Sequence, residues 1–295
     1  MDKFAQAITT LADTLKRPDM TGEMLRQSLV KVLQLAERAD QATRDTLLEQ
    51  VSGLTLTTSI SRASYLAIGC GALVEEGADP LRGLTPLMTR TREALEGAVP
   101  FVEACQRAAE ASENPPEDAE GRVEMFGEHI AEQMPAEAAA FDAAPRLCQA
   151  MTAFLSHSME ARRVAHTNTE LISACKLMPF DPGFVDFLHM LLQVLDNEEM
   201  IVLYPKLECG YRIQISGIGD NFQLHTLLAG ALIGDPQQGW LPGEQPDPRI
   251  AAMAKDAPFT EEDMEKLSAE GRFNLVNWQG LQPDGTLPEG QRSGH

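Results

Sequence analysis

Two histidine–glutamate pairs have the spacing that metal ligands use on a helix. His157-x-x-Glu160 and His166-x-x-x-Glu170 each place both side chains on one helical face. Carboxylate-bridged two-iron bundles use Glu-x-x-His pairs, whereas here the histidine comes first. His157 and His166 are nine residues apart. On one helix that spacing is a rotation of about 900°, which puts them on opposite sides. We therefore interpret both as surface pairs, favour no metal site and expect no cofactor.

Polar side chains also gather where a predicted strand meets a predicted helix. Three lie on one face of the strand, three lie at the start of the helix, and a tryptophan follows in a loop that could fold over them. Convergent polar groups under a loop are typical of a ligand pocket. These ligand-binding candidates are Arg212, Gln214, Ser216, Asp220, Asn221, His225 and Trp240. The competing interpretation, which we favour, is a half-exposed strand followed by a capped helix.

The turn Gly217-Ile218-Gly219 lies between that strand and helix, where anions often bind. It lacks the third glycine of a dinucleotide fingerprint and the lysine of a P-loop. Asp220 would place its carboxylate on the amides that an anion would need. We therefore predict a structural turn.

The cysteines are isolated along the chain and odd in number. No Cys-x-x-Cys pair occurs, which disfavours thiolate zinc sites and thioredoxin chemistry. No Gly-x-Ser-x-Gly nucleophile elbow occurs either. We interpret the five as small buried hydrophobic residues in a reducing cytosol: Cys70, Cys105, Cys148, Cys175 and Cys209.

The charge balance restricts the partners. The 295 residues include 44 Asp and Glu but only 24 Lys and Arg, for a formal net charge of −20. Nucleic-acid binders need clustered basic side chains, and anionic membranes repel such a chain. We expect neither partner. The start of the chain lacks a basic segment followed by an apolar one, so the sequence predicts a cytoplasmic protein.

The elements that position these residues are helical up to about residue 199. Asp40 is a plausible cap for a helix that Gly53 would end. The next helix, about 59–76, carries small residues around Gly69 that would let a neighbour approach closely. A further helix runs over about 85–111. A helix of about 20 residues follows up to Phe141.

Two more helices complete this part. Apolar residues along one stripe predict a single helix over Pro145–Met178, about 50 Å long. A last helix starts at Asp181-Pro182. Its expected packing face consists of Phe184, Phe187, Leu188, Leu191 and Leu195.

The pattern changes after residue 200. Residues 200–204 and 211–216 are predicted strands, and the second alternates apolar and polar positions. Asp220 would cap a helix to about Ile233, and a Pro- and Gly-rich loop covers 234–258. A short helix at 260–263 and a third strand at 273–278 are expected beyond it.

Residues 210–228 include Gly-Ile-Gly-Asp-Asn-Phe-Gln-Leu-His at positions 217–225. This segment resembles uncharacterised bacterial proteins that have no assigned function. The resemblance implies a bacterial origin and no particular chemistry.

Together the patterns predict a mainly α protein. A multi-helix antiparallel bundle or array over 1–199 precedes a small α+β region over 200–295. No long flexible linker separates the two, so they could pack as one body. The expected function is that of a cytosolic, non-catalytic interaction or scaffold protein that binds a protein partner or its own copy. The alternative is a small-molecule binder or enzyme with its pocket at 212–225. A metal-dependent bundle enzyme is the less favoured form of that alternative.

Overall fold

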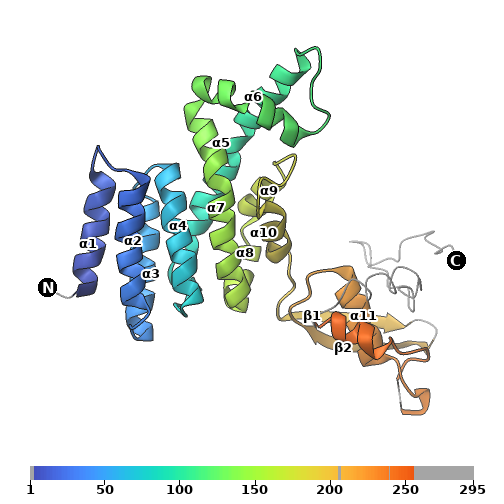
Figure 1. The fold of residues 1–295 in the computed structure, drawn as a ribbon. Helices are drawn as coiled ribbons and strands as arrows, with labels where there is room; N and C mark the ends of the chain where they lie inside the picture. Colours follow the sequence, from blue (N-terminus) through green and yellow to red (C-terminus); the bar gives the residue numbers. More distant parts are fainter. Residues whose placement is uncertain (1–2, 205–206, 239, 256–295) are drawn as a thin grey trace. The chain divides into compact units, whose positions relative to one another are not determined.

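The computed structural model describes residues 3–204, 207–238 and 240–255. The fold is mainly α with a small two-stranded sheet near the C-terminus, as the sequence predicts (Figure 1). The chain divides into two compact units, Met1–Gln193 and Val194–His295. This division falls N-terminal to the boundary expected after residue 199. Among the described helices, none combines the length and the apolar composition that crossing a bilayer requires.

The first unit is an array of helices that run side by side (Figure 1). Its central helix, α7, packs against both α4 and α5, whereas α1 lies at one edge against α2 and α3. The elements are α1 (Lys3–Lys16), α2 (Gly22–Ala36), α3 (Gln41–Thr55), α4 (Ile60–Glu75), the 3-10 turn η1 (Pro80–Arg82), α5 (Leu84–Glu110), α6 (Ala119–Gln133), α7 (Pro135–His157), α8 (Met159–His166), α9 (Thr169–Cys175) and α10 (Val185–Leu192).

The main core of this unit lies around α4, α5 and α7. Leu66, Leu95 and Phe154, one from each helix, are fully buried there. The small residues of α4 allow close approach, as predicted. A Cβ atom added at Gly69 would lie 2.6–2.9 Å from the side chain of Leu29 on α2.

Helix α3 shows which local signals hold. The carboxylate of Asp40 accepts a hydrogen bond from the backbone N–H of Thr43 at 2.9 Å, which confirms the predicted cap. The prediction that Gly53 ends the helix is wrong. The helix continues to Thr55, and the Gly53 carbonyl accepts a hydrogen bond from the N–H of Leu56. Gly53 thus keeps a helical backbone and does not adopt the left-handed turn of a C-terminal glycine.

The prediction of one helix over 145–178 is wrong, as is the helix end expected at Phe141. Pro145 lies inside α7, and two polar residues further along the chain divide the rest of the predicted helix. Ser158 and Asn168 each accept a hydrogen bond from the backbone N–H three residues later, at 3.1 and 3.0 Å. These side chains begin α8 and α9, because a capping oxygen satisfies an amide that would otherwise need a preceding carbonyl.

The predicted packing face of the last helix is also wrong in part. Leu188 is buried, but Phe184 and Phe187 are exposed, and Val185 and Leu192 are buried in their place. Phe184 has a left-handed φ of 64° and precedes the helix. The buried side therefore keeps Leu188 but is rotated toward Val185 and Leu192, which lie on one face with it.

A smaller core lies where α6 packs against α5 and α7. Phe101 and Ile130 belong to it, and the ring of Phe101 lies 5.3 Å from that of Phe141. Helix α6 itself buries only Gly127 and Ile130.

The second unit is built on an antiparallel hairpin. Strands β1 (Glu198–Tyr204) and β2 (Cys209–Ile215) pair from Glu198↔Ile215 to Tyr204↔Cys209. Helix α11 (Asn221–Leu232), the turn η3 (Pro236–Gln238) and α12 (Pro248–Met253) follow. One hairpin face packs with α11 around Val202 and Leu228. The two predicted strands and the helix after Asp220 are confirmed. The elements expected at 260–263 and 273–278 lie outside the described residues.

Candidate functional site

The polar face of β2 is paired with the residues that begin β1. Arg212 forms an ion pair with Glu199, and the side-chain amide of Gln214 donates to the side-chain oxygen of Asn197. The hydroxyl of Ser216 accepts a hydrogen bond from the backbone N–H of Asn197 at 3.1 Å. Arg212 and Gln214 thus share one face of β2 and Ser216 directly follows the strand, while their partners are Glu199 on β1 and Asn197 just before it.

A buried carboxylate that the sequence analysis did not single out holds this junction together. Asp196 is 4% exposed. It accepts hydrogen bonds from the backbone N–H of Gly217 at 3.0 Å and from the hydroxyl of Ser216 at 3.4 Å. Gly217 has a φ of +72°, which glycine adopts without strain. Asp196 therefore fixes the turn between β2 and α11 and acts as a structural acceptor.

The N-terminus of α11 is occupied by its own side chains. Asp220 accepts from the backbone N–H of Gln223 at 2.8 Å, and the side-chain oxygen of Gln223 accepts from the N–H of Gly219 at 2.7 Å. This reciprocal pairing follows the logic of a capping box. It supports the predicted structural turn, since amides that an anion would use already have acceptors.

The remaining junction candidates are His225, Trp240 and Asn221. His225 is half-buried on α11, and burial lowers the pKa of its imidazole below 6.5. Trp240 does not lie over the start of α11. It packs against Gly234, just beyond the other end of the helix. Because α11 has 12 residues and is therefore about 18 Å long, this contact places Trp240 far from the polar groups at the start of the helix. The backbone of Asn221 begins α11, and its side chain lies outside the described part of the chain.

The metal candidates are separated by the breaks in the predicted long helix. His157 ends α7 and His166 ends α8, so they do not share one helix. Ring Nδ1 of His166 lies 2.8 Å from the carbonyl of Leu192, and that of His157 lies 2.9 Å from the carbonyl of Ala153. Glu160 pairs with Arg163 at 2.8 Å, and Glu170 pairs with Arg92. No group of three or more potential metal ligands occurs among the described residues.

The thiols are suited to packing. Cys70, Cys105, Cys148 and Cys175 are buried, as predicted, whereas Cys209 is only half-buried at the start of β2. Burial raises the pKa of Cys175 to about 12 and that of Cys148 well above its usual value. These two side chains therefore remain protonated, which makes them poor nucleophiles.

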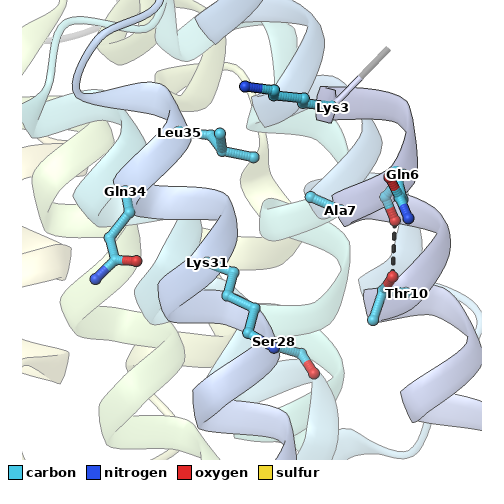
Figure 2. Close-up of a pocket in the computed structure, with 8 residues that line it drawn as sticks. All are labelled: Lys3, Gln6, Ala7, Thr10, Ser28, Lys31, Gln34 and Leu35. Atoms are coloured by element: carbon cyan, nitrogen blue, oxygen red, sulfur yellow. Dashed lines mark hydrogen bonds between the residues drawn. The ribbon is translucent and has the colours of Figure 1, made fainter. Parts of the chain in front are cut away.

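The structure also contains a groove that the sequence analysis missed, between α1 and α2. Its volume is about 390 Å³. Figure 2 shows side chains from both helices around it, with Lys3 and Ala7 on α1 and Lys31 and Leu35 on α2. The sequence feature that could have indicated this groove is one lysine on each helix, Lys3 and Lys31, each on a helical face that it shares with polar residues.

Comparison of the chain with models of protein families, with curated proteins and with solved structures found no match. The resemblance of residues 210–228 to bacterial proteins stays a prediction.

Proposed function

We propose that this chain is a cytosolic, non-catalytic interaction protein that binds a partner protein through the exposed face of α10. One observation carries the proposal. Phe187 and Met190 are three residues apart and lie on the same side of α10, Phe184 directly precedes the helix, and each of the three is about 43–44% exposed. Phenylalanine and methionine are enriched at the centres of protein interfaces, and contiguous exposed apolar side chains mark such sites.

The polar groups of the molecule support a non-catalytic role. At the β2–α11 junction, Gln214 and Ser216 both form hydrogen bonds with Asn197, which directly precedes β1. The metal candidates Glu160 and Glu170 are engaged in ion pairs with arginines. These contacts hold helices and strands in place. All five cysteines are free thiols, which fits the reducing cytosol.

Charge defines the chemistry of the partner. Residues 101–193 contain 15 acidic and 6 basic side chains, so the part of the unit that includes α10 is strongly negative. Complementary charge guides association and sets its rate. The partner is therefore a protein segment with apolar side chains for the α10 face and a net positive charge around them.

The test is capture from the native cell with three forms of the full chain: wild type, Phe187→Glu and the control Leu56→Glu. Leu56 follows α3 and is also exposed, at 49%. A captured protein is identified by mass, purified and titrated against each form. Burial of a Phe contributes about 1.5–3 kcal/mol, so Phe187→Glu should weaken binding at least tenfold while Leu56→Glu leaves it unchanged.

Two results would overturn the proposal. The first is that no purified protein binds wild type more tightly than Phe187→Glu. The second is that the bound segment is acidic and its affinity does not fall with added salt. Circular dichroism of the variants ensures that a loss of binding is not a loss of folding.

A further inference from the structure

The α1–α2 groove contains two lysines that lack a carboxylate partner among the described residues. Three other basic side chains on or next to these helices are paired: Lys16 with Asp13, Arg17 with Asp19, and Arg26 with Glu23. No acidic residue lines the groove that Lys3 and Lys31 flank. In a chain with a net charge of −20, this is a local site of positive charge.

The groove combines that charge with an apolar surface. Ala7 and Leu35 are half-buried in it, and one lysine comes from each helix (Figure 2). On α1 the lining runs from Lys3 to Thr10, which is about 10 Å along the axis. A complementary ligand therefore has an apolar group with carboxylates on either side, spread over about two helical turns.

Helix α6 of the same unit has that complementary surface. Glu124, Glu128 and Glu132 follow one another at intervals of four residues, and all three are exposed. None of them forms an ion pair within the described part of the chain. Met125 lies on the same side of the helix and is 58% exposed. We call these four residues the acidic α6 face.

We propose that the α1–α2 groove binds the acidic α6 face of a second copy of this chain. Met125 enters the groove between Ala7 and Leu35, and carboxylates of α6 pair with Lys3 and Lys31. The contact forms between copies, because within one copy α1 packs with α2 and α3, whereas α6 packs with α5 and α7 at another end of the unit (Figure 1).

The half of the first unit that contains the groove is nearly neutral and the half that contains α6 is strongly negative, so the two lysines of the groove meet the α6 face of a second copy with little opposing charge around them. Residues 1–100 contain 13 acidic and 11 basic side chains, whereas residues 101–193 contain 15 and 6. The contact joins two different surfaces and is therefore head-to-tail, which generates a ring or an open chain of copies. Because exposed ion pairs are individually weak and are screened by salt, the association is weak and decreases as ionic strength rises.

Sedimentation velocity of the full chain tests the proposal by charge reversal. One variant carries Lys3→Glu and Lys31→Glu, a second carries Glu124→Lys and Glu128→Lys, and the control carries Lys16→Glu. Wild type and the control self-associate at low salt, and each charge-reversed variant associates at least tenfold more weakly. An equal mixture of the two reversed variants associates again, because each groove then meets an α6 face of opposite charge.

Three results would overturn the proposal: a wild type that is monomeric at every concentration and salt, reversed variants that associate as wild type does, or a mixture that stays monomeric. All substituted residues are exposed, and unchanged circular dichroism ensures that the variants fold. Phe187→Glu retains this self-association, so the test is independent of the partner site on α10.

Discussion

Replacement of Gly69 by alanine should destabilise the first unit, although alanine is the better helix former. The added Cβ would lie 2.6, 2.7 and 2.9 Å from three side-chain carbons of Leu29, whereas carbon atoms pack at about 3.5–4.0 Å. Leu29 is 7% exposed and has little space into which to move. Overpacking of a core costs about 1–3 kcal/mol, and the gain in helix propensity offsets about 1 kcal/mol of it. The expected net loss is therefore about 1 kcal/mol of the free energy of unfolding.

Two other helical glycines are matched controls for this prediction. A Cβ at Gly53 would have no neighbour within 4 Å, so Gly53→Ala should stabilise the protein by about 0.5–1 kcal/mol. A Cβ at Gly71 would lie 3.5 Å from the Cα of Ala150, an ordinary contact, so Gly71→Ala should fall between the two. Urea unfolding followed by far-UV circular dichroism measures the stability of all three variants. The dependence of the free energy of unfolding on urea concentration should have the same slope in each, so that the values can be compared. If Gly69→Ala is as stabilising as Gly53→Ala, α2 and α4 do not pack so closely that Leu29 blocks a methyl group at position 69.

Further predictions concern the second unit and the main core. Asp196→Ala removes the acceptor of the Gly217 N–H and should cost about 1–3 kcal/mol. Asp196→Asn, which keeps one acceptor oxygen, should cost less, and tryptophan fluorescence during urea unfolding compares them, since both tryptophans follow residue 193. Because burial lowers the pKa of His225 below 6.5, the folded state favours the neutral ring. That contribution is present above about pH 6.5 and is lost as pH falls. His225→Gln should therefore flatten the decrease in stability below pH 6.5, and an unchanged pH profile would contradict this. Phe154→Ala, at a fully buried site in α7, should cost about 3–5 kcal/mol, and a smaller loss by circular dichroism would show that the core collapses around the cavity.

Local chemistry explains where the sequence predicted elements well. Asp40 and Asp220 cap helices because a short carboxylate reaches amides only three residues away. The strand over Cys209–Ile215 alternates because its two faces meet different surroundings. The break before α8 also depends on a capping side chain, that of Ser158, but there the apolar stripe of a continuous helix competes with the cap. Ser158 could extend a helix or begin one, and the apolar stripe favoured the wrong choice.

The candidate site was less accessible from the sequence, because its contacts join residues that are distant in the chain. Asp196 bonds to Gly217, 21 residues later, and no spacing pattern marks that pair. Trp240 was placed over the junction because its loop could reach either end of α11, and its contact with Gly234 decides between them. The α1–α2 groove was missed because a lysine becomes a binding feature only when a neighbouring helix lacks the carboxylate that would pair with it.

The smaller core beneath α6 has a consequence for the motions of the molecule. Since α6 buries only two residues, it has much less to lose on detachment than α7, which buries eleven. Its amide protons should exchange with solvent through local opening that leaves the main core intact. Helix α6, which carries Met125 and the neighbouring carboxylates, can therefore shift slightly relative to the main core before it binds a second copy.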